Sequence, residues 1–331
     1  MRFQSANRQF TQFGISTLLA AALVACGGGG GSVPATNIAP STTPTQPIID
    51  ASTLVTSVPT ATYSGEAAAA FSLLNAERSR CGFGLLAQST TLDAMSMAHA
   101  NYMKLNGVAS HTEVQGLPGF TGVNPQDRAI GYSGTVSEVL ASGSGLDAIH
   151  TLLSAPYHLN VLFGGYRDIG VASLDSNVPG VPYFGANPGY LTAAGKQEMA
   201  GNVVATYPCD GTSGVNYQLR GESPNPVPGR DLAANPIGTP VLFRAHSGNA
   251  LFITSVSMVK TSTGAPIVLR PVISASNDPN GFGYFTTSTA YVAPDAPLER
   301  LTQYTVTFSG TNNGTVFTNR TFSFTTGNGM N

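Results

Sequence analysis

The spacing of apolar residues changes near Cys209, and this change most constrains the fold of the 331-residue chain. Ahead of it, apolar residues such as Ala67, Ala70 and Leu74 recur at the spacing of one helix face. Beyond it the helical period vanishes, and short apolar runs such as 303–309 alternate with turn signals. The sequence therefore predicts an α+β fold followed by an all-β fold, in agreement with the two domains expected from length.

The first folded region, residues 63–212, is expected to place helices around a small sheet in α-β-α layers. One helix is predicted from Ser64 to Gly82, where glycine can adopt the left-handed C-cap conformation. A second helix is predicted to begin at Thr90, with Asp93 as its capping partner. The other predicted elements are a helix over 146–153 and strands over 168–174, 183–186 and 202–207.

The second region, residues 215–331, is expected to form an antiparallel β-sandwich of about 100 residues. Its closing sequence LTQYTVTFSGTNNGTVFTNRTFSFTT resembles the terminal strands of bacterial Ig-like domains, where a Tyr-x-Val strand, a glycine-bearing turn and a Phe-Thr-Thr ending recur. The resemblance implies an Ig-like domain that acts as a spacer or an adhesive module. Strands are predicted over 241–244, 252–258, 267–271, 283–286, 303–309 and 321–326.

Residues 1–25 are expected to be a signal peptide and not part of the fold. Arg2 and Arg8 precede an uncharged apolar stretch that ends at Ala25, immediately before Cys26. This ending resembles the bacterial lipobox, in which the new N-terminal cysteine is acylated. An ordinary secretory signal followed by an incidental cysteine is the alternative. Acyl chains on Cys26 would anchor the protein to a membrane, so we expect a lipid-anchored protein of the bacterial cell envelope.

Residues 26–62 are expected to connect the lipidated cysteine to the folded regions. Five glycines come first, followed by five prolines, many Thr and Ser residues and a single charge, Asp50. This composition is typical of an extended linker that lifts a domain away from a membrane. A first β-strand around 48–58 is the alternative for part of the segment.

The charge content excludes several classes of protein. Charged residues make up 10% of the chain, against roughly 25% in an average soluble domain. Loss of the signal peptide removes two arginines and no acidic residue, so the net charge moves from −2 to −4. A weakly acidic protein has no electrostatic attraction for nucleic acid, and we expect no nucleic-acid partner.

Three cysteines are present, and one of them is assigned to the lipid anchor. Cys81 and Cys209 remain, one near each end of the first region. In an oxidising compartment a disulfide between them would close a long loop and stabilise the fold by about 4–5 kcal/mol. Two unpaired thiols are the alternative. Two cysteines without a C-x-x-C pair do not predict a zinc site.

The five histidines fall into two groups. His99 and His150 lie on predicted helices, where a lone histidine is expected to be a structural core residue, and His246 is expected at the surface. His111 and His158 instead follow helical segments in loop sequence, and they differ from the others in being candidates for a site.

Glu138 is the third candidate for that site. It is one of only two acidic residues between 129 and 166, the other being Asp147. A carboxylate in such an apolar setting needs a partner if it is buried, and imidazoles are natural partners. Two histidines and a carboxylate are also a usable ligand set for a divalent metal.

Three segments resemble a bacterial CAP (SCP-like) domain, in the family of cysteine-rich secretory, antigen 5 and pathogenesis-related 1 proteins. LLNAERSRCGFGLLAQSTTLDAMSMAHANYMKLNGVASHTE resembles the family's opening, and GYSGTVSEVLASG resembles its Gly-x-x-x-Glu-Asn block. LLSAPYHLNVLFGGYRDIGVA resembles the segment with Ser-Pro-Gly-His that leads into a Gly-Val strand. The motifs occur in the family's order over about residues 64–208 and imply its α-β-α sandwich.

The resemblance assigns the cleft histidines to His111 and His158 and the cleft glutamate to Glu138. Val139 replaces the usual Asn after this glutamate, Leu152 replaces a common Trp, and the second cleft glutamate of eukaryotic members has no clear equivalent. Members bind divalent metals, lipids, sterols or peptides, so the ligand-binding set is His111, Glu138 and His158, with Zn on the two histidines as a further expectation.

Three functions are compatible with these residues. The first is a membrane-tethered binding module for a small, lipidic or peptide ligand. The second is a hydrolase in which a metal on the histidines activates water and Glu138 is a ligand or general base. The third is a buried polar network that only stabilises the fold. No G-x-S-x-G or H-E-x-x-H motif is present, and Ser110, Thr112 and Ser137 are weak nucleophile candidates, so an enzyme is the less favoured reading.

Overall fold

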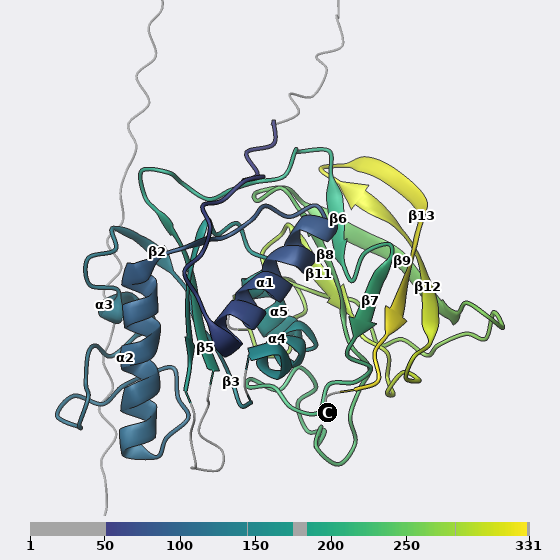
Figure 1. Ribbon diagram of the computed structural model, residues 1–331. Helices are drawn as coiled ribbons and strands as arrows, with labels where there is room; N and C mark the ends of the chain where they lie inside the picture. The colour runs from purple at the N-terminus through teal and green to yellow at the C-terminus, as the bar shows by residue number, and fades with distance from the viewer. Residues whose placement is uncertain (1–50, 144, 175–183, 282, 330–331) are drawn as a thin grey trace, which may run out of the picture. The chain divides into compact units, whose positions relative to one another are not determined.

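The computed structural model describes residues 51–143, 145–174, 184–281 and 283–329, all within the compact unit Ile48–Asn331 (Figure 1). The predicted signal peptide, Cys26 and the linker as far as residue 50 lie outside the described residues. None of the described helices combines the length and the apolar character that a membrane span requires.

Five helices and five strands are described in the first region. The helices are α1 (Gly65–Arg80), α2 (Thr90–Asn106), α3 (Pro125–Arg128), α4 (Gly145–Leu153) and α5 (Pro156–Leu162). The strands are β1 (Ala87–Gln88), β2 (Gly134–Val136), β3 (Val139–Ala141), β4 (Asp168–Ser173) and β5 (Phe184–Leu191). They form one sheet in the order β1-β4-β5-β2, and β3 also pairs with β5.

Helices cover both faces of this sheet. Helix α2 packs against β4 and β5, whereas α1 and α4 pack on the opposite face, where α5 also lies (Figure 1). The two-sided cover explains why β4 and β5 are buried along most of their length. The predicted α-β-α layers are confirmed.

Helix α2 begins at Thr90, as predicted, but its capping residues differ from the prediction. Ser89, not Thr90 with Asp93, is the N-cap, and its hydroxyl accepts a hydrogen bond from the backbone N–H of Leu92. The Asp93 carboxylate instead accepts hydrogen bonds from the Tyr63 hydroxyl at 2.6 Å and from the Val171 N–H at 2.9 Å. Asp93 therefore ties α2 to strand β4 and to the chain before α1, which sequence spacing could not show.

The last residues of the predicted linker lie along the first region. The Thr53 N–H donates to the Glu198 carbonyl oxygen at 2.8 Å, and the Val55 carbonyl accepts from the Leu85 N–H at 2.8 Å. The Thr62 N–H donates to the Gln88 side chain at 2.7 Å. Residues 51–62 are thus bonded to the folded part of the chain, without forming the alternative β-strand.

Two four-stranded sheets make up the second region. One has the order β10-β11-β8-β6 and the other β7-β13-β12-β9. The strand predicted over 202–207 as part of the first region, β6, pairs with β8 of the second region. The domain boundaries stay predictions. The strands are β6 (Val204–Tyr207), β7 (Thr212–Val215), β8 (Val241–Ala245), β9 (Leu251–Lys260), β10 (Ile273–Ser274), β11 (Thr289–Val292), β12 (Gln303–Asn312) and β13 (Thr315–Thr326).

Two of the predicted strands are absent from the second region as described. Residues 267–271 form only an isolated bridge, Leu269 to Pro294, since the prolines at 266 and 271 cannot donate to a ladder. Residues 283–286 are irregular, and the Thr286 N–H donates to the Thr289 hydroxyl instead of to a neighbouring strand. Apolar content alone did not distinguish these segments from strands.

The sheet that contains β8 is buried on both faces. Phe243 packs toward the other sheet of the sandwich, in the cluster that contains Phe308. Leu242 and Tyr207 face the first region, where the rings of Tyr207 and Phe163 have centroids 4.6 Å apart. The core of the first region therefore includes residues from this sheet of the second region.

Cys81 and Cys209 form a disulfide between the end of α1 and the loop after β6. Because β6 belongs to the β8 sheet, this bond joins the helical layer of the first region to the sandwich. The free cysteine alternative does not hold for this pair.

Replacing both cysteines by alanine should lower the free energy of unfolding by about 4 kcal/mol, because the bond closes a long loop in the unfolded chain. Guanidinium unfolding of the oxidised protein and the variant measures the difference. A Cys26→Ala variant is the control, since it leaves the disulfide intact. Equal midpoints for all three proteins would contradict the prediction.

Candidate functional site

Glu138 lies between strands β2 and β3, and its side chain is only 1% exposed. Its Oε2 accepts a hydrogen bond from Arg128 Nη2 at 2.7 Å, and its Oε1 is 2.9 Å from His111 Nδ1. Asn187 Nδ2 of β5 donates to Oε2 at 3.3 Å. Both oxygens of this buried carboxylate are therefore paired, as the apolar sequence around it required.

A second buried carboxylate, Glu113, organises the loop that carries His111. It accepts hydrogen bonds from the backbone N–H groups of Thr121 and Gly122, and it is 2.8 Å from His99 Nδ1. The other ring nitrogen of His99 donates to the Ser110 carbonyl oxygen at 2.8 Å. The loop after α2 is thus fixed from its inner side, next to the position of His111.

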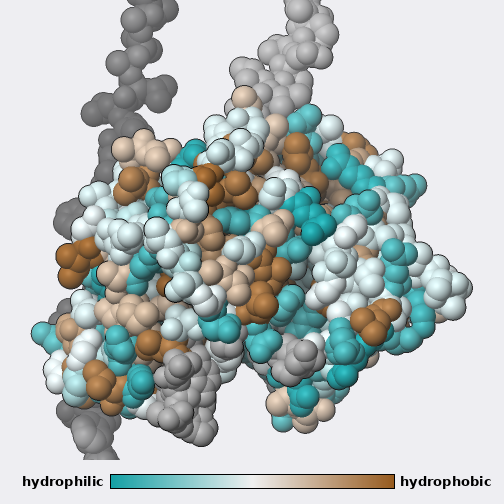
Figure 2. Space-filling model, viewed as in Figure 1, coloured by the Kyte–Doolittle hydropathy of each residue, from teal (hydrophilic) through white to brown (hydrophobic). Residues whose placement is uncertain are grey.

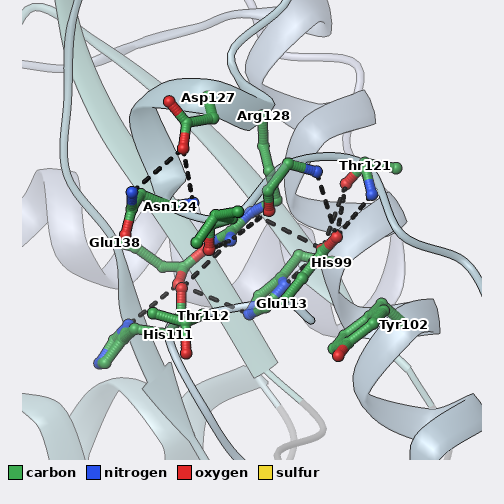
Figure 3. A network of polar contacts seen from close by, with 12 residues as sticks. His99, Tyr102, His111, Thr112, Glu113, Thr121, Asn124, Asp127, Arg128 and Glu138 are labelled. Carbon is green, nitrogen blue, oxygen red and sulfur yellow. Dashed lines mark hydrogen bonds and ion pairs between the residues drawn. The ribbon is translucent and has the colours of Figure 1, made fainter. Parts of the chain in front are cut away.

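Arg128, at the end of α3, connects the two carboxylates. Its guanidinium is fully buried, and Nη1 donates to the His111 carbonyl oxygen at 3.1 Å while Nη2 bonds Glu138. Its Nε lies 3.8 Å from Glu113 Oε1, too far for a hydrogen bond. Figure 3 shows that Arg128, His99 and both glutamates form one network behind the exposed ring of His111.

The charges in this network favour an ionised Glu138. Burial by itself would raise the pKa of its carboxyl, but the hydrogen bond with His111 and the electrostatic interactions with His99 and Arg128 outweigh burial. The pKa of Glu138 therefore lies below the ordinary glutamate value. His111 Nδ1 faces a carboxylate and is expected to carry the proton, which leaves Nε2 as the nitrogen available to a ligand.

His158, on α5, completes the exposed part of the site. The ring centroids of His111 and His158 are 6.5 Å apart, so the fold brings the two predicted histidines together. Their side chains are 46% and 13% exposed, respectively, in contrast to the buried network behind them. His158 is not hydrogen-bonded to Glu138 in the described part of the chain; its Nδ1 is 2.9 Å from Glu222 Oε1.

Glu222 comes from the segment between β7 and β8, outside the region that resembles a CAP domain. Its Oε1 also accepts from the backbone N–H groups of Tyr157 and His158 in the first turn of α5. The segment is held by a bridge between Leu219 and Ile237, which pack with Ala155. Burial raises the pKa of Glu222, and the hydrogen bonds from α5 offset this rise only in part.

A pocket of 640 Å³ opens at the two histidines. Most of its remaining wall is apolar or small, and it receives Leu140 and Ala141 from β3 and Leu152 from α4. Glu222 lines the side next to His158. The volume lies within the range of small-molecule sites, about 300–1,000 Å³.

Sequence reasoning found the exposed histidines and Glu138 but not the residues that hold them. His99, expected to be a plain core residue, is buried as a member of the network. Glu113 stands two residues after His111, and a carboxylate between glycine-rich segments was the available signal. No sequence signal connected Glu222 with the site, since it is 64 residues away from His158 along the chain.

The other candidates lie outside the network. His150 and His246 do not line the pocket, and Asp147 is likewise absent from its wall. The hydroxyls of Ser110 and Thr112 bond each other at 3.0 Å, and the Ser137 hydroxyl accepts from Tyr166. Within the described ranges none of these hydroxyls is hydrogen-bonded to an imidazole, so the geometry does not favour a serine or threonine nucleophile.

The donor set fits a metal ion only in part. Zinc-binding imidazoles are usually oriented by a carboxylate at the second ring nitrogen, and His111 and His158 both have this arrangement. Catalytic zinc sites normally have three protein ligands. Across the described ranges, no group of three or more His, Cys, Asp or Glu side chains is placed to hold a metal.

Glu138→Gln should lower the free energy of unfolding by about 3 kcal/mol at pH 7, because Arg128 loses its ionic partner. Since the folded pKa of Glu138 is depressed, its stabilisation is complete above the ordinary glutamate pKa of about 4.3 and is lost below it. Urea unfolding from pH 7 to 3 should show the difference shrinking as pH falls. Glu299→Gln, in an exposed ion pair, is the control. A pH-independent difference would contradict this reading.

Glu222→Ala should destabilise the protein by about 1–3 kcal/mol, because two backbone N–H groups and His158 lose their acceptor. Glu222→Gln keeps an acceptor oxygen and should restore most of the loss, in line with the raised pKa of this carboxyl. Thermal unfolding of the two variants separates the roles of charge and of acceptor. If glutamine were as harmful as alanine, the acceptor role would be wrong.

One family model matches the chain: residues 71–184 match the family described as CAP, cysteine-rich secretory protein family. These residues contain the buried network, His111 and His158, whereas Glu222 lies beyond them. The comparison with curated proteins finds no match.

Solved structures that resemble the chain include two bacterial proteins. One is an extracellular protein containing an SCP domain from Bacillus anthracis str. Ames, 24% identical over 38% of this chain and 40% of that chain, with a TM-score of 0.32. The other is an outer surface protein from Borrelia burgdorferi, 23% identical over 37% of this chain and 90% of that chain, with a TM-score of 0.32. The chain thus spans less than half the length of the first of them. By the family match, the chain contains a domain of the CAP family.

Proposed function

We propose that the chain is an exported binding protein whose CAP domain holds a small lipidic ligand in the cleft of His111 and His158, with the buried Glu138 orienting the ring of His111. The observation that carries the proposal is the 640 Å³ pocket, whose wall contains two imidazoles and is otherwise formed mainly by apolar or small residues. A ligand with an acyl chain and a polar head matches such a division of surface.

The apolar part of the pocket suits an acyl chain. Leu140, Leu152 and Ala155 line it, and their neighbours are small residues that leave room beside them. Apolar contact contributes to affinity roughly in proportion to the area removed from water. The pocket is open to solvent at His111, which gives a ligand a path to enter.

The polar part of the pocket suits a head group with acceptor oxygens. Nδ1 of each exposed imidazole is bonded to a carboxylate, Glu138 or Glu222, which fixes the ring and leaves Nε2 for the ligand. The buried network holds the backbone of His111 as well, through Arg128. A fixed ring loses little conformational freedom on binding, and this raises affinity.

The predicted signal peptide and Cys26 support a location in the bacterial cell envelope, with a lipid anchor as the membrane contact. The Pro/Thr-rich segment then acts as a spacer, and the C-terminal sandwich as a module that supplies Glu222. A peptide ligand is the alternative occupant of the same cleft.

Titration calorimetry of the full chain with decanoate and with a lysophospholipid tests the proposal. We expect one site per chain and at least a tenfold loss of affinity in His111→Ala and His158→Ala, whereas His246→Ala, outside the pocket, should bind as the wild type does. Absence of heat with both probes, or binding that both cleft variants retain, would overturn lipid binding in this cleft.

A second candidate is a divalent metal, favoured by the carboxylate-oriented imidazoles. His111 and His158 would supply two ligands to Zn²⁺, and its remaining ligands would come from water or a bound molecule. We derive no hydrolytic step, since the third protein ligand is missing among the described residues. Zinc titration of the wild type and of the double variant His111→Ala, His158→Ala decides this candidate.

A further inference from the structure

A second pocket, of 340 Å³, lies between the CAP domain and the sheet that contains β8. Tyr166 and Tyr190 come to it from the first region, and Arg244 and Ser288 from the sandwich. No residue lines both this pocket and the histidine cleft. Seams between folded parts are frequent ligand sites.

Arg244 brings an unsatisfied donor to this pocket. Its Nη2 donates to the carbonyl oxygen of Asn160 at 3.0 Å and to the side-chain oxygen of Asn160 at 2.5 Å. Its Nε is shielded from solvent and has no hydrogen-bond partner among the described residues. A buried N–H without an acceptor is unfavourable, so an acceptor oxygen supplied by a ligand would improve its environment.

Glu198 brings an unsatisfied acceptor to the same pocket. Its Oε2 accepts from the Ser247 N–H at 2.9 Å. Its Oε1 is shielded and has no hydrogen-bond partner in the described part of the chain; Lys196 Nζ is 3.6 Å away. One pocket thus contains a donor that needs an acceptor and an acceptor that needs a donor.

Positive charge predominates around the pocket. Arg78 is buried close enough to Arg244 to interact with its charge, and among the described residues it donates to backbone carbonyl oxygens. Burial lowers the pKa of Arg244 to about 10, and burial together with the charge of Arg244 lowers the pKa of Arg78 to about 9, so both are charged at pH 7. With Lys196 and Glu198 included, two positive charges remain uncompensated, and such a site attracts anions.

Aromatic rings and hydroxyl groups form much of the remaining wall. The rings of Tyr166 and Tyr190 have centroids 6.2 Å apart, and the Tyr166 hydroxyl donates to Ser137 Oγ at 2.9 Å. Gly164 permits this placement, because a Cβ there would lie 2.6 Å from the Tyr166 ring. The wall therefore offers flat apolar faces beside groups that both donate and accept hydrogen bonds.

We propose that this pocket binds an acidic sugar, with its carboxylate on Arg244 and a hydroxyl donating to Glu198. Guanidinium groups match carboxylates in geometry and charge, and sugar hydroxyls fit the remaining polar wall. An amino acid also has an acid and a donor, but its net charge of zero would leave the excess positive charge uncompensated. The proposal is independent of the ligand in the histidine cleft.

Titration calorimetry of the full chain with glucuronate tests the proposal, with glucose and glycine as comparison ligands. We expect one site per chain for glucuronate, with at least tenfold weaker binding of glucose and glycine. Lys196→Glu and Arg244→Gln should each reduce glucuronate affinity at least tenfold. Arg320→Glu, on the distant strand β13, makes the same charge change as Lys196→Glu and should have no such effect.

The design separates folding from binding. Lys196 is half exposed, so Lys196→Glu is expected to fold even if Arg244→Gln does not, and circular dichroism checks both. His111→Ala should keep glucuronate affinity, which distinguishes this pocket from the cleft. Absence of binding, equal affinity for glucose or glycine, or equal weakening by Arg320→Glu and Lys196→Glu would each overturn the proposal.

Discussion

The pairing of Glu138 with Arg128 is the interaction on which the candidate site depends. Both side chains are buried, and burial of either charge alone would be strongly unfavourable. Once paired, Arg128 also holds the backbone of His111, and Glu138 holds its ring. The position of an exposed histidine is therefore determined by two buried charged side chains, which do not form part of an outer surface such as the one drawn in Figure 2.

Two glutamates orient the two exposed imidazoles in different electrostatic environments. Glu138 is paired with the charged Arg128, which favours its ionised form, whereas the hydrogen bonds that Glu222 accepts from α5 do not compensate its burial. The two histidines thus face carboxylates whose pKa values are shifted in opposite directions, although both distances are 2.9 Å.

Much of the fold could be predicted from sequence because local patterns carry it. Helices α1, α2 and α4 form close to their predicted ranges, and the ends of α1 at Cys81 and of α2 at Gly107 are local signals. The site could be predicted only as far as its motifs extend. His111, Glu138 and His158 stand in such motifs, but the partners of His158 and of Arg128 are set by tertiary packing.

The strand errors have the same physical origin. An apolar run predicts burial, and residues 267–271 are next to the core without joining a ladder, because prolines limit their donors. Strand β6 was predicted correctly as a strand but was assigned to the wrong sheet, because it follows the first region in sequence and pairs with β8 of the second. The position of a strand near a domain boundary does not determine which sheet it joins.

The shared sheet bears on how the protein can be altered. A CAP domain cut at its family boundary would leave behind the glutamate that clamps His158, the cysteine that bonds Cys81 and the sheet that covers Phe163. Grafting the cleft onto another scaffold would therefore require residues up to at least 222, together with the strands that support them. In this protein the cleft depends on residues that lie beyond the segment that matches the family.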